Sequence, residues 1–208
     1  MKHISGETIA SYDKRYRANL INSVTGFKSV ALIGTLSRNN VTNLAIFSQI
    51  IHVGANPPLI GVLFRPHTVP RHTLENIQDS GVFTINHISE DFVKEAHHTS
   101  ARWDESEFDA CGLQPTYSEG FKAPYVEGAQ VQLGCSFVEQ QIIQANETVF
   151  LIGAIQELRL TNGILQDDGF VDLEKAGSLC ASGLDSYHRT EKIARYSYAK
   201  PDRSPQEI

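Results

Sequence analysis

Short apolar stretches recur along the chain, and most are separated by Gly, Pro or Asn, a pattern typical of strands and turns. Arg38-Asn39-Asn40 and Ala145-Asn146-Glu147 are predicted hairpin turns, because Asn tolerates a positive φ. Hairpins rather than helices therefore join most strands, and we predict a mainly β protein, an antiparallel barrel with added helices. The predicted strands cover residues 28–37, 42–47, 59–64, 82–86, 131–144 and 148–160.

Two stretches have apolar residues at a helical spacing. Residues 12–23 and 69–80 are predicted helices, ended by Gly26 and Gly81. Pro70 would occupy the first helical position of the second helix, where its missing N–H does no harm.

The middle of the chain predicts one more helix and then loses its pattern. This helix would follow Ser89 as its N-cap and carry His97-His98 in its last turn. Residues 99–124 show no regular period and are expected to form a long loop. We expect one domain over residues 1–208, with a C-terminal tail from about residue 182.

Charge and cysteine content exclude several classes of protein. The formal net charge is -6 and the sequence pI is about 5.7, so no nucleic-acid partner is expected. No apolar run has membrane-spanning length, and the first residues lack the apolar core of a secretory signal. Cys111, Cys135 and Cys180 are odd in number and widely spaced, which predicts no disulfide framework and a cytoplasmic location. Without HExxH or CxxC, no metal site is expected.

Donor side chains follow one of the predicted strands. We expect residues 42–47 and 59–64 to be neighbouring buried strands, joined by a polar connector that ends at Asn56-Pro57-Pro58. The second stretch is followed by the hydroxyl and cationic residues Arg65, Thr68, Arg71, His72 and Thr73. A dianionic phosphate needs such donors, because it has several acceptor oxygens and is costly to bury without partners. A helix start at Pro70 would add free backbone N–H groups, so these residues suit a phosphate site. The alternative is a solvated polar exit from two core strands.

Several motifs in this region occur in a fixed order. They are Thr42-Asn43-Leu44-Ala45-Ile46-Phe47-Ser48, Asn56-Pro57-Pro58, Arg65-Pro66, Thr68 and Gly81-Val82-Phe83-Thr84-Ile85-Asn86. On these motifs the chain, from about Arg15 to Pro201, resembles the flavin reductase-like family with an FMN-binding split barrel, including its flavoredoxin-like members. The resemblance implies an antiparallel Greek-key split barrel, a homodimer, and FMN near the subunit interface. Many members carry Lys where this chain has Glu107.

The resemblance also implies which residues contact FMN. The segment around Asn43–Ser48 and the following strand would line the ring, and the Thr and basic residues would hold the phosphate. The apolar wall behind the ring would come from Leu44, Ile46 and Leu63. The full set of expected FMN contacts is Asn43, Leu44, Ala45, Ile46, Ser48, Leu63, Arg65, Pro66, Thr68, Arg71, His72 and Thr73.

Further side chains are candidate neighbours of the ring or of a substrate, namely His98, Ser100 and Tyr187. Tyr187 could instead pack the tail onto the barrel, and Trp103 could stack on the flavin or cover an apolar edge. His97 and His98 could equally serve as cations that end a helix.

Two functions fit these expectations. In the first, the protein is an FMN-dependent oxidoreductase that takes hydride from NADH or NADPH and passes electrons to free flavin, ferric iron or another acceptor. No GxGxxG motif follows a strand, so any nicotinamide would stack directly over the flavin. In the second, the protein is an FMN electron carrier without reductase activity of its own, and its acceptor is a small molecule or a protein. In both, the flavin carries the chemistry, and no catalytic side chain is assigned.

Overall fold

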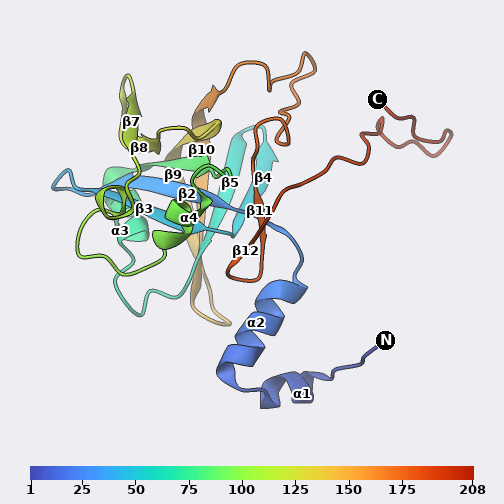
Figure 1. Cartoon of the computed structure of the whole chain (residues 1–208), viewed down its shortest axis with the longest axis horizontal. Coiled ribbons are helices and arrows are strands. Elements are labelled where there is room, and N and C mark those ends of the chain that lie inside the picture. Colours follow the sequence, from blue (N-terminus) through green and yellow to red (C-terminus); the bar gives the residue numbers. More distant parts are fainter.

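The computed structural model describes all 208 residues, and most of its strands belong to one large sheet (Figure 1). This sheet has seven strands in the order β3-β2-β6-β9-β10-β5-β4, and each neighbouring pair is antiparallel. The strands are β2 (Ala31–Leu36), β3 (Thr42–Phe47), β4 (Ile50–Ala55), β5 (Pro58–Phe64), β6 (Val82–His87), β9 (Val131–Ile143) and β10 (Thr148–Leu160). The expected mainly β, antiparallel architecture is confirmed.

The large sheet curls on itself. Its two edge strands, β3 and β4, are consecutive in the sequence and are joined only by Ser48 and Gln49. Such a short connection requires the two edges to lie close together. Inside the curl, the rings of Phe47 on β3 and Phe64 on β5 meet with their centroids 4.9 Å apart. The larger hydrophobic core fills this interior and stabilises the curled form.

One missed strand changes the predicted topology. Residues 50–55, expected to be a polar connector, form β4 and pair with β5. The expected pairing of β3 with β5 is therefore wrong, because β5 lies between β4 and β10 while β3 pairs only with β2. Ile51, His52 and Val53 are all exposed, so this edge strand lacks the alternation of apolar and polar residues that predicts a strand.

Two short helices cover the outer side of the curl at one end of the sheet. α4 (Val93–His98) and α5 (Glu107–Cys111) pack against β3, and they share a second hydrophobic core with Leu32 and Leu44. β7 (Pro115–Ser118) and β8 (Phe121–Val126) form a separate hairpin beside them. The prediction of a long loop over residues 99–124 is therefore wrong. These elements are only four to six residues long, too short for a period to be visible.

α3 (His72–Ser80) packs against β2 and β3 and ends where the sequence predicts (Figure 1). Gly81 adopts the left-handed conformation with φ 75°, which only glycine adopts without steric cost. The helix starts later than expected, because Arg71 is its N-cap and Pro70 precedes the cap.

α4 carries His97 and His98 in its last turn, as predicted, but its start differs. Its N-cap is Phe92, which makes no side-chain capping bond. The Ser89 hydroxyl donates instead to the Asp91 carboxylate, 3.4 Å away, so the prediction that Ser89 caps the helix is wrong.

The chain ends lie outside the large sheet. α1 (Gly6–Ser11) and α2 (Lys14–Val24) contain no buried residue, and Figure 1 shows both standing away from the sheet. β1 (Lys28–Ser29), separated from β2 by Val30, pairs with β11 (Cys180–Ser182), which pairs in turn with β12 (Ser186–His188). The last residues form an extended arm with Tyr198 exposed. The structure contains no helix with the length and apolar character needed to cross a membrane.

Candidate functional site

The ends of β3 and β5 meet although the two strands do not pair. The backbone N–H of Leu63 donates to the Gln49 carbonyl across 3.0 Å, and the neighbouring Phe47 and Phe64 rings pack edge-to-face against each other. Ser48 and Arg65 each directly follow one of these phenylalanines. The curl thus brings the polar residues after both strands to one end of the sheet, as the sequence predicts.

A buried hydrogen-bond network ties the start of α3 to the start of β3. The Asn43 Nδ2 group donates to the hydroxyl oxygens of Thr35, 3.1 Å away, and Thr73, 3.0 Å away. The Asn76 Nδ2 group donates to the same Thr35 oxygen across 3.1 Å. All four side chains are buried. Arg65 follows Phe64, which packs against Phe47 at the C-terminal end of β3, and Thr73 is bonded to Asn43 near its N-terminal end. The segment from Arg65 to Thr73 therefore runs beside β3 from one end to the other.

Exposed donors project from this segment. Arg65, Thr68 and His72 are exposed, and their side chains make no hydrogen bond within the protein. The backbone N–H groups of His72, Thr73 and Leu74 also have no partner, because the N-cap residue provides no capping side chain. Unpaired amides at a helix N-terminus attract anions, and neighbouring cations strengthen this attraction.

Arg71 and Glu75 stabilise the turn before α3. The Glu75 carboxylate accepts hydrogen bonds from the Arg71 backbone N–H, at 2.9 Å, and from His67 Nε2, at 2.7 Å. The Arg71 N–H and His67 lower the pKa of Glu75 below its ordinary value. The Arg71 guanidinium donates to the Pro66 carbonyl at distances of 3.3 and 3.4 Å. Glu75 was not predicted, although an acid in the first turn bound to the N-cap amide is a known helix-start pattern.

The outer edge of β3 is only partly covered. β3 pairs with β2 on one side, and on the other side the Leu44 N–H donates to Glu107 Oε2, 2.9 Å away. Thr42 Oγ1 and Ser106 Oγ, 2.7 Å apart, form a second bond between β3 and the start of α5. Since alternate backbone groups of a strand point the same way, the Ile46 N–H and C=O also face this edge. They have no partner there.

The side chains of β3 are more buried than a ring-lining role requires. Leu44 is fully buried beneath α5, and Asn43 belongs to the buried network. Ala45, Ile46 and Ser48 are half-buried, as is Leu63 on β5. Any contact from Leu44 to a ligand would therefore come from its backbone.

Comparisons with known proteins identify the family and the fold of the chain. The sequence model of one protein family, the flavin reductase like domain, matches residues 27–174, which is most of the chain. The chain belongs to the flavin reductase like family. A solved structure from Shewanella frigidimarina, described as a candidate flavin reductase with a split barrel domain, is 46% identical. It superposes with a TM-score of 0.93 and covers 96% of this chain and 100% of that one.

Two more distant structures share the fold of this family. Flavoredoxin of Desulfovibrio vulgaris is 24% identical, with a TM-score of 0.70 over 84% of this chain and 91% of that one. An FMN-binding protein from Thermus thermophilus is 18% identical, with a TM-score of 0.67 over 82% and 91% of the two chains. The split-barrel fold expected from the motifs is thereby confirmed.

Two of the residues predicted to lie near the flavin ring or a substrate, Tyr187 and His98, make separate contacts in the structure. Tyr187 packs against the second hydrophobic core, and its hydroxyl lies 2.7 Å from His97 Nδ1. Burial raises the pKa of Tyr187. His98 is exposed and lies edge-on to Trp103, whose indole N–H donates to the His98 carbonyl. No hydrogen bond joins His98 or Ser100 to β3 or to residues 65–73.

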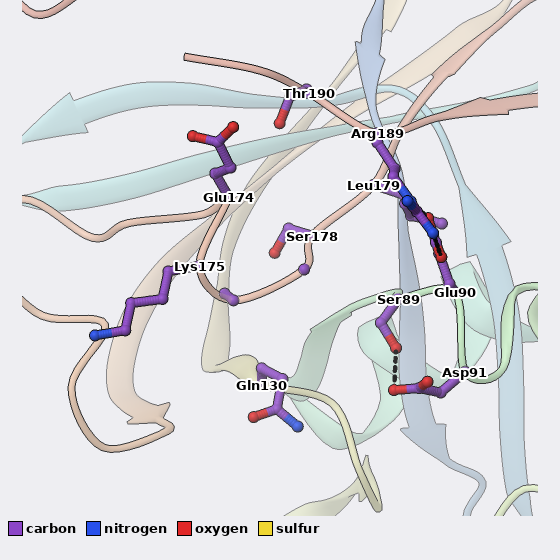
Figure 2. A pocket seen from close by; sticks show the side chains of 12 residues that line it. Ser89, Glu90, Asp91, Gln130, Glu174, Lys175, Ser178, Leu179, Arg189 and Thr190 are labelled. Atoms are coloured by element: carbon purple, nitrogen blue, oxygen red, sulfur yellow. Dashed lines mark hydrogen bonds and ion pairs between the residues drawn. The ribbon is translucent and has the colours of Figure 1, made fainter.

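A groove of about 470 Å³ lies elsewhere on this flavin reductase like chain. Figure 2 shows its lining: the Ser89 hydroxyl approaches Asp91, and Arg189 pairs with Glu90. None of the residues predicted to contact FMN lines it. The candidate site therefore consists of β3 and residues 65–73, where the unpaired donors lie.

Proposed function

We propose that the protein is an FMN-dependent oxidoreductase of the flavin reductase type. It would take hydride from NADH or NADPH and deliver electrons to free flavin, ferric iron or another acceptor. The observation that carries this proposal is the arrangement of two unpaired donor sets: the exposed donors at the start of α3, and the open edge of β3 at Ile46. One set suits a phosphate and the other a flat heterocycle with polar edges.

The phosphate would lie at the start of α3. Arg65, Thr68 and His72 supply side-chain donors there, and the free amides of the first turn supply more. Arg71 contributes the guanidinium N–H groups that do not bind Pro66. Thr73, which the sequence also suggests as a phosphate contact, is buried and bonded to Asn43, and it would support the start of α3 from within. Charge-assisted bonds of this kind are worth about 1.5 to 3 kcal/mol each.

The ring would lie against the C-terminal end of β3. The Ile46 N–H and C=O and the Ser48 hydroxyl can bind its polar edge, while Leu63 supplies an apolar surface nearby. Asn43, Leu44 and Ala45 would support this edge from within the sheet. Bound FMN supplies the hydride-accepting and electron-donating chemistry, and the chain supplies placement and exclusion of water.

A second copy of the chain would complete the assembly, as the family resemblance implies. Single-chain packing leaves the apolar residues Ile51 on β4, Phe27 before β1 and Ile193 in the C-terminal arm at least half exposed. Burial of such apolar surface against a partner is favourable. Sedimentation at micromolar concentration is expected to give a dimer, and a monomer would contradict this part of the proposal.

Purified protein loaded with FMN tests the main proposal. Steady-state oxidation of NADH or NADPH in the presence of free flavin or ferric iron is expected, and no turnover with either nucleotide would contradict the reductase function.

An electron carrier is the second candidate, because the same donors would bind FMN in a carrier. The fold shared with flavoredoxin keeps this candidate open. Rapid mixing with NADH or NADPH separates the two: bleaching of the flavin band supports the reductase. A flavin that stays oxidised with both nucleotides, and yet accepts electrons from a partner protein, supports the carrier.

A further inference from the structure

Glu107 covers one part of the outer edge of β3. Its carboxylate holds the Leu44 N–H at 2.9 Å, and the adjacent Ser106–Thr42 bond fixes the start of α5 in the same place. Beyond this point the edge is open, since the next outward N–H, that of Ile46, has no partner. The site proposed for the flavin ring therefore lies directly next to Glu107 along the edge of β3.

The charge of Glu107 has no counterion. Its side chain is half-buried, and no Lys, Arg or His nitrogen lies within ion-pair distance of it. The acidic residues that do form ion pairs are Asp79, Glu75, Glu90 and Asp168. The field of the Glu107 carboxylate therefore extends along the edge without a cation to cancel it.

The spacing along β3 sets how far this charge lies from a bound ring. Leu44 and Ile46 are two residues apart on one strand, so their outward N–H groups are separated by about 7 Å. That separation is shorter than the screening distance of about 8 Å at physiological ionic strength. A heterocycle bound to the Ile46 N–H would therefore experience the charge of Glu107.

We propose that Glu107 lowers the reduction potential of the flavin bound at the β3 edge, and this inference rests on the proposed FMN site. Two electrons and one proton convert the neutral oxidised ring into a reduced ring with one negative charge. The nearby carboxylate repels that charge, so it weakens the binding of reduced FMN more than that of oxidised FMN. Glu107 thus makes the reduced flavin a stronger electron donor.

The substitution Glu107→Gln tests this inference, because it removes the charge and keeps an oxygen that can accept the Leu44 N–H. We expect the binding of reduced FMN relative to oxidised FMN to improve about tenfold, which raises the two-electron potential by about 30 mV. The potential is measured by stepwise dithionite titration against an indicator dye of known potential. Glu107→Lys, which reverses the charge, is expected to raise the potential further.

Asp109→Asn is the matched control. Asp109 lies in the first turn of the same helix, but it is exposed and its side chain makes no bond to β3. The potential is expected to stay at the wild-type value in this variant. An unchanged potential in Glu107→Gln, or an equal shift in Asp109→Asn, would overturn the inference while the FMN site stands. Failure of the wild-type protein to bind FMN would overturn the proposed function and this inference with it.

Discussion

Two groups of polar side chains lie within a few residues of each other on β3, α3 and the segment between β5 and α3. Asn43, Thr73 and Asn76 are buried, and each bonds to another protein side chain. Arg65 and Thr68 are exposed and have no protein partner. The comparison shows that a polar residue type alone does not indicate a ligand contact. A buried polar group whose hydrogen bonds are made within the protein holds β3 and α3 together. An exposed donor without a protein partner is available to bind a ligand.

Asn43→Ala should produce the largest effect, because it breaks the buried group. The substitution removes two hydrogen bonds and leaves the buried hydroxyl groups of Thr35 and Thr73 with fewer partners. We expect the free energy of unfolding to fall by about 3 to 4 kcal/mol in chemical denaturation. Thr68→Ala, in the exposed group, is the control and should change it by no more than about 0.5 kcal/mol. Equal losses of unfolding free energy in Asn43→Ala and Thr68→Ala would contradict the distinction between the buried and the exposed group.

His87 is a partly buried side chain that titrates. Burial lowers the pKa of His87 to about 4 from its ordinary 6.5, and its Nδ1 lies 3.0 Å from the Ser178 hydroxyl. The unfolded chain then binds a proton that the folded chain does not, so this contribution to stability is lost as the pH falls from 6.5 towards 4. The loss should reach about 3 kcal/mol.

Denaturation at several pH values measures this loss. His87→Asn keeps a polar group near the Ser178 hydroxyl and does not titrate. The variant should therefore show a shallower decline of unfolding free energy between pH 6.5 and 4 than the wild type. If the unfolding free energies of variant and wild type decline in parallel, His87 is not the group whose titration causes the loss.

Arg65→Ala tests the exposed group through its ligand. We expect FMN to bind about tenfold more weakly or worse, corresponding to about 1.4 kcal/mol or more, with the unfolding free energy unchanged. Riboflavin lacks the phosphate, so its affinity should be the same in variant and wild type. The two affinities are measured by quenching of flavin fluorescence. If both Arg65→Ala and Arg71→Ala leave FMN affinity unchanged, the phosphate lies elsewhere.

The smallest effect that we predict is the loss of stability in Glu75→Gln, because the Glu75 side chain is more than a third exposed. Glu75 lies in the sequence between residues of the buried group and of the exposed group. Its lowered pKa means that its charge stabilises the fold above the ordinary pKa, and this stabilisation is lost as the pH falls through the folded value. After allowance for solvent screening, we expect a loss of about 0.5 kcal/mol at neutral pH and no difference in strong acid.

The same substitution removes a negative charge beside the proposed phosphate site. FMN should therefore bind about two- to threefold more tightly to Glu75→Gln than to the wild type. Asp79→Asn, at the far end of α3, is the control for this increase. Weaker FMN binding in Glu75→Gln would indicate that Glu75 orders the turn rather than repels the ligand.

Sequence patterns predicted the long elements, and sequence motifs supplied the residues of the candidate site. The hairpin of β9 and β10 follows from the alternation that begins at Val131, the apolar run that begins at Thr148 and the turn residues between them, and the end of α3 follows from Gly81. The same reasoning missed β4 and α5, which are short and lack a period. It also missed the role of Glu107, since its bond joins residues 63 positions apart in the sequence.

The sequence by itself determined the antiparallel β class, the hairpins and the family, because these depend on local periods, turn residues and motifs that are contiguous in the chain. Only the tertiary structure decided which polar residues are free to bind. Asn43 lies in the same motif as Ser48, and Thr73 lies in the same donor-rich segment as Arg65. The curl of the sheet and the packing of α3 nevertheless bury Asn43 and Thr73, and leave Ser48 half-buried and Arg65 exposed. Burial depends on contacts between distant segments, and no local pattern encodes them.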